Sequence, residues 1–353
     1  MTGLIVAGLV VVGLLWWLGA MFWMPGASVS GPLAPPTQRE AALSARLARD
    51  VEALAGEIGE RNVLHYDELL AAADYIDGAL EAAGYEVHRQ RYELDGRPYD
   101  NLEVEQRGST SADEVVVVGA HYDTVPDSPG ANDNASGVAS LLALAEYFVT
   151  RQTARTLRFV AFANEEAPFA HTARMGSVVY AKRSKARGER IAAMISLETM
   201  GYFTDEPNSQ RYPSVLRWIY PDTGNFIAFV SNLGSRGLLK RALRAFRSHA
   251  SIPSEGGAVP ERLPGVGWSD HWSFWQEGYR AIMVTDTALY RYPAYHAEGD
   301  IPDQVDFERL ARVVAGLEIV VADLAGGVTG TVSPRRPTEP DVIPPQDLPE
   351  LVE

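Results

Sequence analysis

The fold is decided by residues 114–137, which read EVVVVGAHYDTVPDSPGANDNASG. An apolar run rich in valine ends in His121, Tyr122 and Asp123, and a turn rich in Gly and Asn then leads into an apolar stretch with helical spacing. A buried strand, a polar turn and a helix form the repeating unit of α/β sheets. Functional groups of such sheets gather where the strands end. This segment therefore predicts both the fold class and the place of a site.

The same pattern recurs along the chain. Further apolar runs cover residues 157–163, 191–197 and 281–285, and each ends in acidic or other polar residues. Residues 86–94 and 101–107 favour an antiparallel pair of strands. Helices are predicted near 40–58, 67–83, 136–150, 173–186, 236–248 and 305–325. The sequence thus predicts an α/β fold with a mixed, mostly parallel central sheet and helices on both faces.

The composition indicates a folded protein and excludes some functions. The chain has 353 residues, of which 46% are hydrophobic, and a formal net charge of −15. This charge would repel a phosphate backbone, so we expect no nucleic-acid partner. The chain contains no cysteine, which excludes disulfides, thiolate zinc ligands and cysteine nucleophiles.

The N-terminal segment indicates a membrane anchor. Residues 3–24 carry no charge and are long enough to cross a bilayer as one helix, so we expect a single transmembrane anchor over 1–24. A cleaved signal peptide is the alternative, although no Lys or Arg precedes the apolar run. We expect the catalytic domain to lie outside the cytoplasm.

Three further segments follow the anchor. Residues 25–37 are rich in Pro, Gly and Ser, which is typical of a linker. Residues 38–328, between the linker and the tail, would form one catalytic domain. They contain no long internal repeat, so a solenoid or propeller is not expected. Residues 329–353 are Pro-rich and acidic, which predicts a disordered tail.

Imidazole and carboxylate groups lie close together after the first long strand. His121 and Asp133 are residue types that zinc binds, and Asp123 is placed to accept the second ring N–H of His121. For the segment around Asp133, a helix N-cap is the plain alternative.

Three other groups carry candidate chemistry. Glu165 and Glu166 follow a strongly apolar strand, and two adjacent carboxylates can divide metal binding and proton transfer between them. A solvated loop is the alternative for this pair. Glu198 ends the next strand, whereas His296 lies in a Tyr-rich loop where a structural histidine is the common case.

The order of these motifs resembles the co-catalytic zinc exopeptidases, which include aminopeptidase Y, secreted bacterial aminopeptidases, glutamate carboxypeptidase and glutaminyl cyclases. The resemblance covers roughly residues 115–300. It implies two Zn²⁺ ions per chain, with one ion bound by His121 and Glu198, the other by Glu166 and His296, and Asp133 bridging both. It also implies that Glu165 is the general base and that Tyr295 polarises the scissile carbonyl.

Several segments differ from that pattern or extend it. Glu198 stands where many family aminopeptidases have Asp. Residues 167–175 replace a short Gly-rich turn, and this insert either forms a pocket wall with His171 and Arg174 or is a solvated loop. Residues 203–265 are long and loop-rich, which is typical of a specificity region. The Ser-Asp-His motif that contains Asp270 and His271 would line and brace the site.

The resemblance implies a metallopeptidase that removes N-terminal residues from peptides, with the membrane contacted through the anchor. A carboxypeptidase would need cations for a substrate carboxylate, for which Arg174, Arg262 and Arg280 are candidates. A glutaminyl cyclase of the same fold would not use His121. A non-enzymatic ectodomain is the third alternative, and the presence of all five ligand types argues against it.

Overall fold

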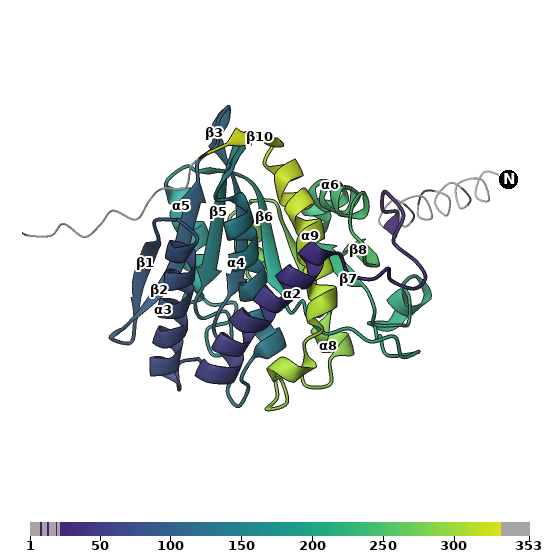
Figure 1. Cartoon of the computed structure of the whole chain (residues 1–353), viewed down its shortest axis with the longest axis horizontal. Coiled ribbons are helices and arrows are strands. Elements are labelled where there is room, and N and C mark those ends of the chain that lie inside the picture. Colours follow the sequence, from purple (N-terminus) through teal and green to yellow (C-terminus); the bar gives the residue numbers. More distant parts are fainter. Residues whose placement is uncertain (1–7, 9–12, 14–18, 20–21, 333–353) are drawn as a thin grey trace, which may run out of the picture.

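The computed structural model of the protein describes residues 8, 13, 19 and 22–332. Its centre is an eight-stranded sheet with the strand order β1-β2-β5-β3-β6-β9-β7-β8 (Figure 1). The strands are β1 (His88–Leu94), β2 (Arg97–Gln106), β3 (Ser111–His121), β5 (Arg155–Phe162), β6 (Arg190–Glu198), β7 (Ile227–Ser231), β8 (Ser254–Ala258) and β9 (Ala281–Thr285). Four neighbouring strands at the centre, β5, β3, β6 and β9, are parallel. The predicted mixed sheet is confirmed.

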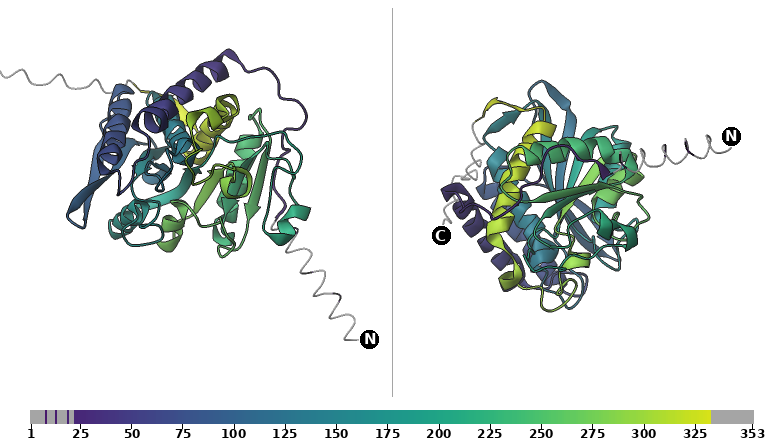
Figure 2. Two further views of the ribbon diagram at one scale, coloured as in Figure 1. Left: turned by 90° about the horizontal axis from the view of Figure 1, so that it is seen from below. Right: turned by 90° about the vertical axis from the view of Figure 1, so that its right-hand side faces the viewer.

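Helices cover both faces of the sheet (Figures 1 and 2). The larger hydrophobic cluster joins one face to α2 (Gln38–Val51), α3 (Tyr66–Ala82), α4 (Ser136–Phe148), α6 (Arg236–Arg247) and α9 (Phe307–Leu324). The smaller cluster joins the other face to α5 (Gly176–Ala186) and α7 (His271–Gln276). Strand β3 supplies both clusters alternately, with Val116 and Val118 on one side and Val115 and Val117 on the other, as the two-residue period of a strand requires.

The long elements and the short strand β9 agree with the prediction from sequence, whereas several other short elements were missed. Strand β8 reads Ser-Glu-Gly-Gly-Ala, which has little intrinsic preference for a strand and depends on pairing with β7. Also missed were β7, the short helices α7 and α8 (Ala288–Arg291), and the small sheet of β4 (Arg151–Thr153) and β10 (Val328–Thr331). Strand β10 extends into the segment predicted as a tail, and the rest of that prediction, residues 333–353, lies outside the described residues.

The predicted linker lies against the domain. The Ser28 hydroxyl accepts a hydrogen bond from the main-chain N–H of Ser254 at 2.8 Å, and a guanidinium nitrogen of Arg312 donates to the carbonyl of Ala34 at 2.6 Å. Thr37 then caps α2 through a capping box with Glu40. These contacts fix the path of the chain from residue 28 to the first helix of the domain.

Most of the predicted membrane anchor, residues 1–24, lies outside the described residues. Among the residues that are described, no helix is both long enough and apolar enough to cross a bilayer. The anchor therefore stays a prediction.

Candidate active site

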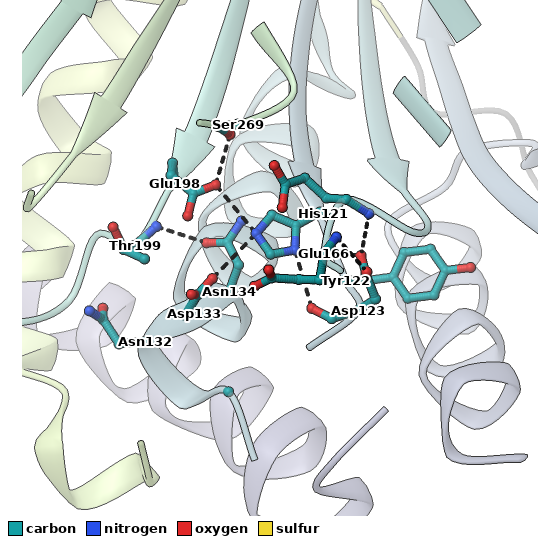
Figure 3. A network of polar contacts seen from close by, with 12 residues as sticks. His121, Tyr122, Asp123, Asn132, Asp133, Asn134, Glu166, Glu198, Thr199 and Ser269 are labelled. Carbon is teal, nitrogen blue, oxygen red and sulfur yellow. Dashed lines mark hydrogen bonds and ion pairs between the residues drawn. The ribbon is translucent and has the colours of Figure 1, made fainter. Parts of the chain in front are cut away.

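The carboxyl ends of the parallel strands bring the predicted site residues to one edge of the sheet. His121 is the last residue of β3, Glu198 is the last residue of β6, and Glu165 and Glu166 follow β5. The strands are in register, so that His121 pairs with Phe162, which ends β5. Figure 3 shows the side chains of His121, Glu166 and Glu198 gathered below these strand ends.

Imidazole and carboxylate groups form two ligand groups that share Asp133. His121 Nε2 lies 3.3 Å from Asp133 Oδ1 and 3.3 Å from Glu198 Oε2. His296 Nε2 lies 3.0 Å from the other Asp133 oxygen, Oδ2, and 3.4 Å from Glu166 Oε1. The structure thus brings together the five side chains that the sequence analysis named as ligands.

The electrostatics of the cluster favour a cation. His121 Nε2 and both carboxylate oxygens of Asp133 are buried and have no hydrogen-bond partner. Burial alone would lower the pKa of His296, but its close contacts with the carboxylates of Asp133 and Glu166 raise it to about 10. Burial, and after it the charge of Asp133, raise the pKa of Glu166 to about 7. Buried carboxylates that compete for protons in this way are stabilised by a metal ion, so the residues present fit a zinc site.

The main chain around Asp133 is held by a second carboxylate. Asp300 accepts hydrogen bonds from the N–H groups of Asn132 at 2.8 Å and Asp133 at 3.0 Å, and from the Tyr292 hydroxyl at 2.9 Å. The peptide bond between Asp133 and Asn134 is cis. Asp300 was not predicted as a site residue, although it follows His296 by only four positions and is fully buried.

Two asparagines join the Asp133 turn to the neighbouring strand end. The Asn134 amide donates to the carbonyl of Leu197 at 2.9 Å and accepts from the N–H of Thr199 at 3.0 Å (Figure 3). Asn132 accepts from the N–H of Gly201 at 2.7 Å. Asp133 and Glu198 are therefore positioned by one hydrogen-bonded unit.

The contacts of Asp123 differ from the prediction. Its two carboxylate oxygens accept the main-chain N–H groups of Glu165 and Glu166, each at 3.0 Å. The hydrogen bond of His121 Nδ1 is to the main-chain carbonyl of Asp123 at 3.2 Å, and the carboxylate lies farther away at 3.5 Å. Because a carbonyl only accepts, Nδ1 carries the hydrogen and the lone pair of Nε2 points to the ligand cluster.

A buried arginine that the sequence analysis missed supports the loop behind the site. The Arg61 guanidinium is fully buried and donates to five main-chain carbonyls, including those of Tyr122 at 2.6 Å, Pro129 at 2.6 Å and Gly130 at 2.9 Å. Burial lowers its pKa to about 10, which still leaves it charged at neutral pH. An isolated arginine in a loop gives no signal in the sequence, because its role depends on carbonyls distant along the chain.

The Ser-Asp-His motif touches the ligand cluster through its serine. The Ser269 hydroxyl donates to Glu198 Oε2 at 2.7 Å and lies 2.7 Å from the hydroxyl of Ser196. Asp270 is fully buried, and burial raises the pKa of its carboxyl to about 7. His271 Nε2 donates to the carbonyl of Val266 at 2.7 Å. Asp270 and His271 therefore lie beside the cluster and outside its three ligand groups.

Glu165 and Tyr295 lie next to the ligands. Glu165 forms a possible ligand group with His121 and Glu166, and burial raises the pKa of its carboxyl well above the ordinary value. The Tyr295 ring stacks on the ring of His296 with centroids 3.8 Å apart. Tyr295 and Glu198 both line one cavity, so Tyr295 and the ligand cluster border the same space.

The insert at 167–175 is held by contacts to the domain. His171 Nε2 lies 2.8 Å from the carbonyl of Gly267, and its ring stacks on Trp272 with centroids 4.4 Å apart. Arg174 forms two hydrogen bonds with Asp95, at 2.7 and 2.9 Å. Neither side chain lines the cavity beside Glu198.

The cavity beside the ligand cluster has mostly apolar walls and an empty volume of about 930 Å³. Much of its lining comes from the loop-rich segment 203–265, and the remainder comes from the end of β6, from Val266 and Trp268, and from β9 and the residues after it. Its apolar walls include Phe226, Phe229, Val259, Met283 and Leu289. A side chain bound next to Glu198 and Tyr295 would enter this space.

Comparisons with known proteins identify the family of the chain. The model of peptidase family M28 matches residues 101–319. The protein YfbL of Escherichia coli (strain K12) is 36% identical over 293 residues, which cover 80% of this chain and 88% of that protein. BSAP, a zinc aminopeptidase from Bacillus subtilis, superposes with a TM-score of 0.62 at 15% identity, over 79% of this chain and 94% of that one. A glutaminyl cyclase from Fimbriiglobus ruber gives a TM-score of 0.57 at 17% identity, over 85% and 99% of the two chains. The structural likenesses show the shared fold, and the sequence matches show that the chain belongs to peptidase family M28, a family of metallopeptidases.

Proposed function

We propose that the protein is a two-zinc aminopeptidase. The observation that carries the proposal is the pair of ligand groups around Asp133, with His121 and Glu198 on one side and Glu166 and His296 on the other. Bound zinc polarises a carbonyl and makes water a better nucleophile at neutral pH. The unpaired buried atoms of His121 and Asp133 support two ions as the resident cofactors.

Three side chains would serve the reaction around the ligands. Glu165 would accept the proton of the attacking water and deliver it to the leaving amine, because its pKa is raised by burial and it adjoins the ligands. Tyr295 would donate a hydrogen bond to the oxygen on which charge develops. Asp123 would act as a positioning residue, because it holds the N–H groups of both glutamates in place.

The charge and shape of the site favour a peptide with a free amino terminus. An ammonium group would be attracted by the acidic side chains of Glu165, Glu166 and Glu198, all of which are buried at the ligand cluster. The adjoining apolar cavity would accept the first side chain of the substrate. We therefore expect a preference for large apolar N-terminal residues.

The contacts of the candidate cations argue against a carboxypeptidase. Arg174 is paired with Asp95 on the β1–β2 hairpin. Arg280 precedes β9 and thus lies at the amino end of a strand whose carboxyl end adjoins the site. Arg262 directly precedes Leu263 and Pro264, which line the apolar cavity. Arg262 itself is not one of the lining residues.

Matched reporter peptides test the aminopeptidase proposal. Leucine 4-nitroanilide should be hydrolysed and its N-acetyl derivative should not, because acetylation removes the ammonium charge. A peptide with a blocked C-terminus and a free N-terminus should remain a substrate. Cleavage of the acetylated and free compounds at equal rates would contradict the proposal, and release of C-terminal residues alone would favour a carboxypeptidase.

We also propose that residues 1–24 anchor the protein in a membrane with the catalytic domain outside the cytoplasm. The uncharged segment 3–24 supports the anchor, and the contacts of residues 25–34 with the domain support a short distance between membrane and domain. Full-length protein should stay with membranes after a high-salt wash. Recovery of a mature chain that begins near residue 28–33 would contradict the anchor and indicate signal cleavage.

A further inference from the structure

Large apolar side chains are exposed at the edge of the sheet that ends in β8. Trp218 is 78% exposed, Ile219 is 46% exposed, and Trp23 is 61% exposed. Trp218 and Ile219 lie at the end of the short helix η3 (Ser214–Trp218). Figures 1 and 2 show η3 and the described N-terminal residues side by side at this edge. Large exposed aromatic residues that lie together are typical of an interaction surface.

Residues 22–28 are fastened to the same edge. The ring of Phe22 contacts the ring of Tyr220 with centroids 6.2 Å apart. A guanidinium nitrogen of Arg247 donates to the carbonyls of Pro25 at 3.3 Å and Gly26 at 3.2 Å. The chain therefore enters the domain at a defined place, directly after the uncharged segment 3–24.

Basic residues accompany the exposed aromatic rings. The guanidinium of Arg217 lies 4.8 Å from the ring centroid of Trp218, and the amine of Lys240 lies 4.6 Å from that of Trp23. Helix α6, which carries Lys240, has basic residues and no acidic one, although the whole chain has a net charge of −15. Tryptophan next to Lys and Arg is the combination that lies at the headgroup level of membranes with anionic lipids.

We propose that Trp23, Arg217, Trp218, Ile219 and Lys240 form a membrane-contact face that rests in the headgroup layer of an anionic bilayer. The face continues the segment predicted to enter the bilayer, and its charge is opposite to that of anionic lipid. It also adjoins the substrate cavity, because Tyr220 contacts Phe22 with its ring and lines the cavity. Tyr220 therefore joins the face to a wall of the cavity, and the face does not depend on the peptidase chemistry.

Single cysteines can test this proposal, because the chain has none of its own. Full-length Trp218→Cys protein carries an environment-sensitive fluorophore and is reconstituted into vesicles of phosphatidylethanolamine and phosphatidylglycerol. Leu64→Cys is the matched control, because Leu64 is 72% exposed and precedes α3 near the opposite edge of the sheet. Ile219→Cys is a second reporter in case the replacement of Trp218 disturbs η3.

The expected result is a several-fold loss of emission at positions 218 and 219 when the acyl chains are brominated, with no change at position 64. Charge reversal by Arg217→Glu should reduce this loss. The proposal would be overturned if a water-soluble quencher reached the labels at positions 218 and 219 as readily as the label at position 64. Shielding in native membranes alone, which would indicate a protein partner, or a failure of the full-length protein to bind the vesicles would also overturn it. Hydrolysis of a soluble reporter in the same samples tests the proposed function separately.

Discussion

Replacement of Asp123 by asparagine tests how the metal site is positioned. The carboxylate of Asp123 accepts the N–H groups of Glu165 and Glu166, each at 3.0 Å, and it is buried. Hydrogen bonds to a charged group are worth roughly 1.5–3 kcal/mol each, and a buried N–H without a partner costs about 1–3 kcal/mol. Asparagine keeps one acceptor oxygen and turns an amide donor toward the second N–H. We therefore expect Asp123→Asn to lower the free energy of unfolding by roughly 2–4 kcal/mol.

The same substitution should weaken zinc binding, because both glutamates lose their fixed position. Loss of a residue that orients metal ligands typically lowers metal affinity by about 10–100-fold. Urea unfolding of the metal-free protein measures the change in stability, and competition with a chromogenic chelator measures zinc affinity. Asp127→Asn is the matched control, since Asp127 is an exposed aspartate in the same loop. Equal stability and zinc affinity in Asp123→Asn and Asp127→Asn would refute the reasoning.

Three further predictions follow from the geometry. Glu165→Gln should keep its zinc, and its turnover rate should fall by roughly 10²–10⁴-fold, as expected for the loss of a general base. Glu166→Gln should lose zinc and activity together. Elemental analysis and steady-state kinetics distinguish the two outcomes, and the reverse pattern would show that the two residues have the opposite roles. Burial lowers the pKa of His271 from its ordinary value of 6.5 to about 4, so the unfolded chain binds a proton that the folded chain does not. The stability present above pH 6.5 should therefore fall by up to roughly 3 kcal/mol as the pH falls to about 4, and His271→Gln should remove this part of the slope in urea titrations at several pH values. Gly137→Ala should destabilise the protein by about 1–3 kcal/mol, because an added Cβ would lie 2.6 Å from a main-chain carbonyl oxygen of β6. Gly78→Ala is the control: its added Cβ would meet nothing within 4 Å, and the substitution should stabilise the protein. Equal melting temperatures of the two variants would argue against the close approach of Gly137 to β6.

Three of the candidate ligand positions were predictable because each lies at the end of a strand that the sequence marks clearly. Valine-rich and other apolar runs specify buried parallel strands, and the ends of neighbouring parallel strands must meet at one edge. His121, Glu166 and Glu198 could be placed on this basis before any contact was known. Their order along the chain then indicated the family, which the comparisons confirm.

The residues that support the ligands could not be placed in the same way. Arg61 acts through carbonyls of the main chain, and Asp300 acts through N–H groups of the Asp133 turn, so neither role leaves a pattern of residue types. The carboxylate of Asp123 was expected to accept a hydrogen bond from the ring of His121. Its oxygens instead accept the main-chain N–H groups of Glu165 and Glu166 in the turn after β5. Contacts of this kind depend on the relative position of two loops, which local sequence does not specify.

Metal content measured together with activity is the most direct test of a two-metal hydrolase. Purified protein should contain two zinc ions per chain by elemental analysis, and stepwise removal by a chelator should abolish hydrolysis of leucine 4-nitroanilide. His121→Ala and His296→Ala, one from each ligand group, should each reduce the zinc content and the activity. Restoration of activity by added zinc would support the assignment. Full activity in protein that elemental analysis shows to be metal-free would contradict it.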